Sequence, residues 1–244
     1  MNILVVNDDG YQAEGIHLLA RALSPFGNIY VSAPKTHQSA KSHGITISNR
    51  IEMFVETPIV GAKGMIVVDG SPADATRLGL KMFNVDFDLV VSGINDGVNI
   101  ARDVLYSGTV AAAIEAKVLG VPAIAISADR IDLPYLYDET IKIMDEIIES
   151  KLYDGPGILN INFPKETFNR PLGVKMTTLG QRFQHAEYVK SEKADTFFIK
   201  FSTIDYQESE DSDVVAFKEG YISVTPITLE RTDHRWLEQI KNLG

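Results

Sequence analysis

The sequence predicts an α/β protein built on a mostly parallel, doubly wound sheet, and two observations support that prediction. Short apolar runs that end at glycine, proline or polar residues recur through residue 127, and such runs are typical of buried parallel strands. Segments with apolar residues at helical spacing separate these runs. Strands that alternate with helices in this way pair in parallel and place helices on both faces of the sheet.

The expected elements follow in a regular order along the first two thirds of the chain. Strands are predicted at residues 1–6, 28–34, 65–70, 88–93 and 122–127. Helices are predicted at residues 16–23, 73–83, 110–119 and 137–150. The last of these helices is amphipathic, because Ile141, Met144 and Ile147 fall on one side of it.

The sequence pattern changes after Pro164. Strands are predicted beyond it at residues 174–178, 196–201 and 221–225, and a short helix at 234–243. The acidic run at residues 208–213 is interpreted as a solvated loop. We therefore predict two parts, an α/β core at residues 1–165 and a β-rich C-terminal extension at residues 166–244.

The composition excludes several classes of function. The 244 residues carry a formal charge of −10 and give a pI near 5.0, so binding to a nucleic acid backbone or an anionic membrane is not expected. The absence of cysteine excludes disulfides and thiolate nucleophiles. No apolar stretch has the length of a membrane span or the pattern of a secretion signal, so a cytoplasmic protein is predicted.

Two adjacent carboxylates follow the first predicted strand. Asp8 and Asp9 precede Gly10, which lets the chain turn sharply. Side chains at the carboxyl end of a strand in an open α/β sheet lie where ligands bind. Because neighbouring carboxylates repel each other unless a cation lies between them, the pair predicts a site for a hard ion such as Mg²⁺ or Mn²⁺. A solvated Asp-Asp-Gly turn is the alternative.

Two later segments carry further candidates. Asn95 follows the strand at 88–93 and offers a neutral carbonyl oxygen to the same ion, with an ordinary Asn-Asp-Gly turn as the alternative. Ser107, Gly108 and Thr109 lead into a predicted helix, where free N–H groups, the helix dipole and two hydroxyls make a phosphate cradle. The alternative here is a plain N-cap, which serine and threonine favour.

The loop after the second predicted strand, residues 34–46, is rich in hydroxyl groups, lysine and histidine. Ser39 could present a hydroxyl oxygen to the metal ion, while His37, Lys41 or His43 could meet a substrate anion. Solvated side chains are the alternative for each of these residues.

Together these segments resemble the SurE family of metal-dependent nucleoside monophosphate phosphatases, also called survival protein E. The resemblance covers nearly the whole chain, and its motifs follow in order at residues 7–10, 39, 70–74, 92–99, 106–113 and 223–227. Several motifs in register are far more specific than any one of them. The family usually has glycine after the serine, whereas this chain has Ala40 at that position. The difference affects the expected conformation of the loop.

The resemblance implies a site and an assembly. Asp8, Asp9, Ser39 and Asn95 are expected to bind one divalent ion per subunit, either Mg²⁺ or Mn²⁺, with Ca²⁺ as a substitute in a crystal. The turn at residues 107–109 is expected to hold the phosphate. The family fold is a three-layer α/β domain whose C-terminal β segment is exchanged between the subunits of a homodimer, which in some members pairs further into a homotetramer.

The function expected from these features is hydrolysis of nucleoside 5'-monophosphates, with 3'-monophosphates as further candidate substrates. The ion would polarise a phosphoryl oxygen and lower the pKa of a bound water. Asp8 would orient or deprotonate that water. Asn95 and the turn from Ser107 to Thr109 would hold the phosphoryl oxygens as charge shifts in the transition state.

Two alternatives stay open at the level of sequence. An aspartyl-phosphate phosphatase would use Asp8 or Asp9 as a covalent nucleophile, although the haloacid-dehalogenase pattern separates its two aspartates by one residue. A receiver-like signalling module also carries an acidic pair for Mg²⁺ after its first strand. That module is shorter and needs a phospho-accepting aspartate after a later strand, for which Asp69 is the candidate.

Overall fold

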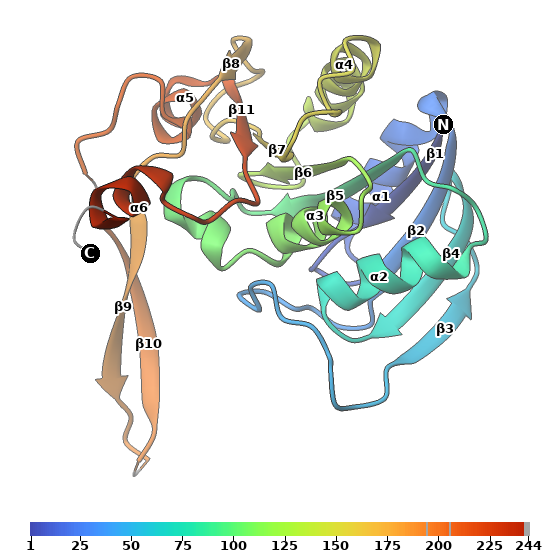
Figure 1. Cartoon of the computed structure of the whole chain (residues 1–244), viewed down its shortest axis with the longest axis horizontal. Coiled ribbons are helices and arrows are strands. Elements are labelled where there is room, and N and C mark those ends of the chain that lie inside the picture. Colours follow the sequence, from blue (N-terminus) through green and yellow to red (C-terminus); the bar gives the residue numbers. More distant parts are fainter. Residues whose placement is uncertain (194, 205, 242–244) are drawn as a thin grey trace.

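A nine-stranded sheet forms the centre of the structure, a computed structural model that describes residues 1–193, 195–204 and 206–241 (Figure 1). The strand order is β3-β4-β2-β1-β5-β6-β7-β11-β8. Six neighbours in the middle run parallel: β4 (Ala62–Asp69), β2 (Asn28–Pro34), β1 (Asn2–Val6), β5 (Leu89–Asp96), β6 (Ala123–Ala128) and β7 (Ile158–Asn162). The predicted α/β fold with a mostly parallel sheet is therefore confirmed.

Antiparallel pairs lie toward both edges of the sheet. β3 (Glu52–Glu56) pairs antiparallel with β4 at one edge. Toward the other edge, β11 (Ile222–Ile227) runs antiparallel to β7 and parallel to β8 (Val174–Met176). Both β8 and β11 come from the C-terminal extension, so part of that extension completes the main sheet. The division at residue 165 stays a prediction.

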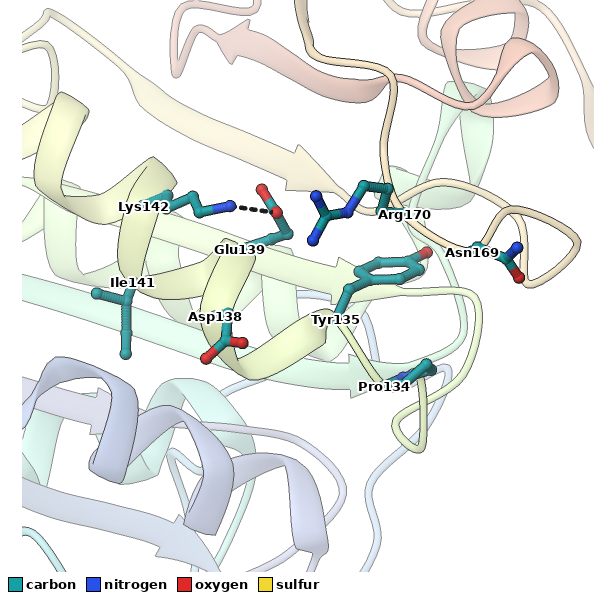
Figure 2. A pocket seen from close by; sticks show the side chains of 8 residues that line it. All are labelled: Pro134, Tyr135, Asp138, Glu139, Ile141, Lys142, Asn169 and Arg170. Carbon is teal, nitrogen blue, oxygen red and sulfur yellow. Dashed lines mark hydrogen bonds and ion pairs between the residues drawn. The ribbon is translucent and has the colours of Figure 1, made fainter.

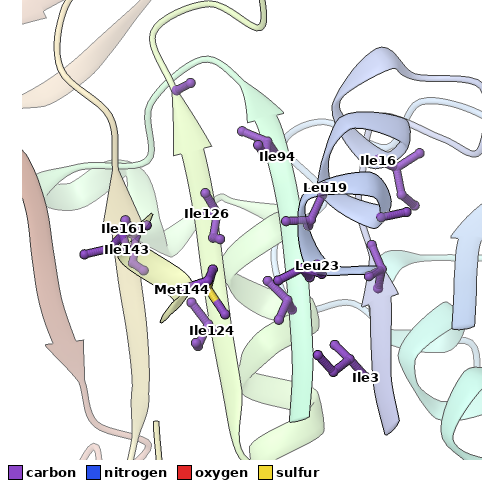
Figure 3. Packing of buried hydrophobic residues seen from close by; sticks show 14 of the residues in the cluster. Ile3, Ile16, Leu19, Leu23, Ile94, Ile124, Ile126, Ile143, Met144 and Ile161 are labelled. Atoms are coloured by element: carbon purple, nitrogen blue, oxygen red, sulfur yellow. The ribbon is translucent and has the colours of Figure 1, made fainter. Parts of the chain in front are cut away.

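Helices cover both faces of the sheet. On one face lie α1 (Glu14–Leu23) and α4 (Leu136–Glu149), and on the other α2 (Pro72–Met82) and α3 (Gly108–Val118). Successive side chains of a strand point to opposite faces, which explains how one strand serves both layers. From β1, Ile3 belongs to the same buried cluster as Leu19 of α1 and Met144 of α4 (Figure 3), whereas Leu4 belongs to the cluster that contains Ala113 of α3.

Four shorter helices are also present among the described residues. They are η1 (Ser24–Phe26), η2 (Ala101–Leu105), α5 (Asp213–Glu219) and α6 (His234–Lys241). The helix predicted at 234–243 is thus observed up to Lys241, and residues 242 and 243 lie outside the described part of the chain. None of the described helices is both long and apolar enough to cross a membrane.

A two-stranded hairpin projects from the body of the molecule (Figure 1). Its strands are β9 (Phe183–Lys190) and β10 (Phe197–Ile204), which pair antiparallel with each other. Phe197 and Phe198 are adjacent, so they point to opposite faces of the hairpin, and each is more than half exposed. Large apolar side chains are therefore in contact with solvent on both faces of the hairpin.

The prediction that the acidic run 208–213 is a solvated loop is wrong for its last two residues, because Ser212 is 1% exposed and caps α5. Asp213 is fully buried as the first residue of α5. Its carboxylate accepts hydrogen bonds from the backbone N–H groups of Ala101 and Gly180, at 2.9 Å each. Burial raises the pKa of Asp213. This side chain ties the loop before β9 to η2, which immediately precedes the predicted phosphate turn.

Candidate active site

The carboxyl ends of β2, β1 and β5 lie side by side, because these strands are neighbours in the sheet. Asp8 and Asp9 follow β1, Ser39 lies in the loop after β2, and Asn95 is the penultimate residue of β5. α3 begins after Ser107, its N-cap. Sheet topology thus brings residues from distant parts of the sequence to the edge where open α/β sheets bind ligands.

Asp8 lies directly against the first turn of α3. Its Oδ1 accepts a hydrogen bond from the Thr109 hydroxyl, and the residue is only 4% exposed. A Cβ on Gly108 would stand 2.7 Å from the Cβ of Asp8, so glycine is required for this close approach. Burial raises the pKa of Asp8, since the loss of water disfavours the charged form.

Ser107 caps α3, because its Oγ accepts a hydrogen bond from the N–H of Val110 at 3.1 Å. This is the N-cap contact that the sequence offers as the alternative to phosphate binding. Helix geometry nevertheless leaves the N–H groups of Gly108 and Thr109 without intrahelical partners at the positive end of the helix dipole. An anion at this turn would be repelled by the Asp8 carboxylate unless a cation lay between them.

Asp9 and Ser39 are joined through His37. Nδ1 of His37 lies 3.1 Å from Oδ1 of Asp9, and its Nε2 lies 2.5 Å from Oγ of Ser39. Burial, with a further contribution from repulsion by Asp8, raises the pKa of Asp9 to about 6. From the sequence, His37 is a candidate contact for a substrate anion. Its position between two predicted metal ligands cannot be inferred from the order of residues.

The residue that follows Asn95 contacts Asp9. The N–H of Asp96 donates to Oδ2 of Asp9 at 3.3 Å. Nδ2 of Asn95 donates one of its two N–H groups to the carbonyl oxygen of Gly97 at 2.6 Å, which sets the orientation of the amide. The carbonyl oxygen Oδ1 is then the atom that Asn95 would offer to a cation.

These side chains offer a hard cation a suitable set of donors. Two carboxylates, one hydroxyl and one amide oxygen are ligands that Mg²⁺ and Mn²⁺ prefer. A cation would relieve the unfavourable burial and repulsion that raise the pKa values of Asp8 and Asp9. Across the residues that the structure describes, no three His, Asp or Glu side chains gather as a metal site. A metal site at Asp8 and Asp9 would draw as well on the hydroxyl oxygen of Ser39 and the amide oxygen of Asn95.

The loop that carries Ser39 is anchored to α2 at Asp74. Thr46 donates to the Asp74 carboxylate through its N–H at 3.0 Å and through its hydroxyl at 2.8 Å. Asp74 also forms a reciprocal capping box with Ser71. Burial alone would raise the pKa of Asp74, but the hydrogen bonds from Thr46 and Ser71 outweigh it and lower that pKa.

The same loop is anchored to α3 at Glu115, which is 3% exposed. Nε2 of His43 lies 2.6 Å from Oε2 of Glu115, and Nε of Arg77 on α2 lies 2.5 Å from Oε1. Sequence reasoning missed Glu115, whose only signal is an acidic residue within an alanine-rich helix. Ala40 in this loop has a φ of +58°, in the region that favours glycine, which agrees with the glycine usual in the family.

A buried network of polar side chains holds the segment that links β5 to α3. The N–H of Asn99 donates to Oδ1 of Asn162 at 2.7 Å, and its carbonyl oxygen accepts from Nδ2 of Asn160 at 2.8 Å and of Asn162 at 3.2 Å. Nδ2 of Asn99 donates to Oγ of Ser127 at 2.8 Å. All four residues are buried. The network fixes this segment to β6 and β7, and sequence reasoning missed it.

A separate hollow of about 540 Å³ lies between the start of α4 and Arg170 (Figure 2). Tyr135 lines it, together with an ion pair of 2.6 Å between Glu139 and Lys142. Burial, and then the charges of nearby carboxylates, raises the pKa of Tyr135 to about 12. This hollow shares no residue with the site described above.

Comparison with known proteins identifies the family to which the chain belongs. The model for Survival protein SurE matches residues 3–186. Relatives named 5'-nucleotidase SurE are 36% identical in Alkaliphilus metalliredigens, over 100% of this chain and 99% of that protein, and 39% identical in Actinobacillus succinogenes, over 98% and 100%. The crystal structure of the SurE protein from Aquifex aeolicus is 32% identical, covers 100% of this chain and 99% of its own, and gives a TM-score of 0.81. The chain therefore belongs to the survival protein SurE family.

Proposed function

We propose that this protein is a metal-dependent 5'-nucleotidase that hydrolyses nucleoside 5'-monophosphates to nucleoside and phosphate. The observation that carries the proposal is the contact of Asp8 with Gly108 and Thr109, in a chain that aligns over its full length with relatives named 5'-nucleotidase. The same likeness does not favour a receiver-like module or an aspartyl-phosphate phosphatase. Nucleoside 3'-monophosphates are further candidate substrates.

Asp8, Asp9, Ser39 and Asn95 are the residues that would hold one divalent cation, and their oxygen donors support Mg²⁺ or Mn²⁺. Such a cation supplies positive charge to a phosphoryl oxygen and acidifies a water molecule. Asp8 has the further role of orienting or deprotonating the attacking water. The hydrogen bond from Thr109 to Oδ1 of Asp8 supports this role, because it holds the carboxylate in one orientation.

The turn at residues 107–109 would bind the phosphate. The N–H groups of Gly108 and Thr109 lie at a helix N-terminus, and Ser107 adds a hydroxyl to the same turn. Together with the side-chain amide of Asn95, these groups are donors for the phosphoryl oxygens. Donors that are held in place before the reaction stabilise the charge that shifts in the transition state. The buried Asn99 network supports this role because it limits movement of the segment before the turn.

The assembly and location of the enzyme are also part of the proposal. We propose a homodimer or homotetramer that uses the β9–β10 hairpin, because Tyr188, Phe197, Phe198 and Phe201 leave large apolar surfaces in solvent. We propose a cytoplasmic location. The net charge of −10 supports small-molecule substrates rather than nucleic acid or anionic membrane.

Phosphate release from a panel of nucleoside 5'- and 3'-monophosphates tests the function. Activity should disappear in EDTA and return when Mg²⁺ or Mn²⁺ is restored, and Asp8→Asn should abolish it. Asp69→Asn is the matched control, because Asp69 is an exposed aspartate at the end of β4, which β2 separates from β1. Absence of mononucleotide hydrolysis with either ion would refute the proposal. Labelling of Asp69 by acetyl phosphate would favour the receiver-like module instead.

A further inference from the structure

We propose that a cavity beside the first turns of α3 holds the nucleoside of the substrate. This inference rests on the proposed function, since it concerns the part of a mononucleotide that is not the phosphate. The cavity has a volume of about 610 Å³, within the range of small-molecule pockets. Ser107, Ala111 and Ile114 of α3 line it, as do residues 177–179 and the end of β11.

The cavity adjoins the phosphate turn, because Ser107 both caps α3 and lines the cavity. The loop that carries Ser39 contributes to its lining through Ser42 and its neighbour. Ser42 donates through its N–H to the carbonyl oxygen of Tyr106 at 3.1 Å and through its hydroxyl to that of Leu105 at 2.8 Å. A mononucleotide whose phosphate sits on the turn can therefore place its nucleoside in the cavity without leaving the site.

The chemistry of the cavity walls suits a base and a ribose. Leu105, Ile114 and Leu179 present apolar side chains, which suit the faces of a base. Thr178 brings an exposed polar side chain to the same cavity, and the Thr228 hydroxyl, which accepts from the N–H of Glu230 at 3.1 Å, still has its own proton to donate to a ribose oxygen. The walls therefore combine apolar surface with a few polar groups, as small-molecule sites do.

The charge of the cavity also suits an anionic ester. No residue that lines it is Asp or Glu, and Arg231 is basic, while the ring of His43 is paired with Glu115. In a chain with a net charge of −10, such a lining spares a phosphate ester the repulsion that the rest of the surface would impose. The anionic end of the substrate would meet Ser107, and the neutral nucleoside would lie deeper along α3.

The test compares adenosine 5'-monophosphate with ribose 5-phosphate, which lacks the base, in the full-length protein with its activating metal. Leu179→Trp places an indole in the cavity, and Leu105→Trp does so at a side chain that is 61% exposed and so tolerates replacement. Ile45→Trp is the matched control. Ile45 is 38% exposed, against 39% for Leu179, and lines a different hollow of about 320 Å³ beside the same loop.

We expect both cavity variants to lower kcat/KM for adenosine 5'-monophosphate by about tenfold and that for ribose 5-phosphate by less than about twofold. Ile45→Trp should leave the ratio of the two values unchanged. Equal losses for both substrates, or no loss, would overturn the inference. A change of ratio in Ile45→Trp alone would assign the nucleoside to the other hollow and also overturn it. A wild-type protein inactive on every mononucleotide would instead refute the proposed function.

A second measurement does not depend on turnover. Adenosine alone should shift the methyl NMR resonances of Ile114 and Leu179, and it should do so less in Leu105→Trp. Unshifted resonances at saturating adenosine would contradict the inference. The cavity could instead be filled by a second copy of the chain. Light scattering excludes this if the Leu179→Trp variant has the same particle mass as the wild type. A lower mass for this variant would make the cavity an interface between copies and overturn the inference.

Discussion

Asp9 carries a negative charge that the metal-free fold does not favour. Burial and then the neighbouring Asp8 raise its pKa from 3.8 to about 6. Between these two values the folded protein binds more protons than the unfolded chain. The stability that Asp9 contributes is therefore fully present below about pH 4 and is lost as the pH rises through about 6. The metal-free protein should be less stable at pH 7 than near pH 5 for this reason.

Asp9→Asn should raise the free energy of unfolding of the metal-free protein at pH 7. The full pKa shift corresponds to about 3 kcal/mol, and partial solvation of Asp9 reduces the expected gain to about 1–2 kcal/mol. Urea unfolding in EDTA measures the gain, with the exposed Asp69→Asn as control. The variant should also fail to bind Mn²⁺ in calorimetric titration. Undiminished Mn²⁺ binding, or a loss of stability at pH 7, would contradict the expectation.

Gly108→Ala should damage the site rather than the fold. The new Cβ would stand 2.7 Å from Cβ and 2.8 Å from Oδ2 of Asp8, so Asp8 must move. We expect kcat to fall by about 10²-fold and Mn²⁺ affinity to fall with it, because Asp8 would serve both functions. Steady-state kinetics and calorimetry measure the two effects. Gly155→Ala is the control, since no atom approaches the position of its Cβ. If Gly108→Ala has the kinetics and the metal affinity of the wild type, Gly108 is only a replaceable residue of the helix cap.

At the scale of elements, the Asn99 network connects β6 and β7 to the segment that leads into α3. Asn162→Ala removes the acceptor of the buried Asn99 N–H group. A buried donor left without a partner costs about 1–3 kcal/mol, which should appear in urea unfolding. KM for a mononucleotide should rise as well, because the segment before the phosphate turn is released. Asn169→Ala, at an exposed position, is the control. An unchanged KM with reduced stability would limit the network to a structural role.

The same network shows what residue order can predict. Apolar runs specify buried parallel strands, so β1, β2, β4, β5 and β6 follow from the sequence together with the helices between them. In β7, Asn160 and Asn162 interrupt the apolar pattern, and this strand was not predicted. Its asparagines pair with Asn99, more than sixty positions away, and no local pattern carries such a contact. For the same reason the sequence places Asp213 in a solvated loop, because its partners Ala101 and Gly180 are distant in the chain.

The candidate site divides in the same way. Strand ends, an acidic pair and a turn before a helix are local, so the sequence predicts Asp8, Asp9 and the turn at 107–109 as candidates. Contacts across the site are not local. His37 between Asp9 and Ser39, and Glu115 beneath the Ser39 loop, become visible only when the loops are placed by the fold.

At the scale of the whole molecule, the β9–β10 hairpin should decide the oligomeric state. Deletion of residues 185–202, closed by a short Gly-Ser turn, removes the exposed aromatic side chains and leaves the nine-stranded sheet intact. We expect light scattering to give a multiple of the 26.9 kDa chain mass for the wild type and the mass of one chain for the deletion. Phe201→Asp is a milder variant that should weaken assembly without shortening the chain. A wild type that is monomeric at micromolar concentration would refute the proposed assembly.

The pairing of β7 with β11 makes the order of synthesis matter. Leu159 pairs with Pro226, more than sixty positions later in the chain. At about 5–20 residues per second, a ribosome needs roughly 3 to 13 s to make the intervening segment. During that time the outer edge of β7 is unpaired on a nascent chain whose other central strands have all been synthesised. A chain released early keeps that edge open, so an incompletely synthesised chain presents an unpaired strand to which another chain can add.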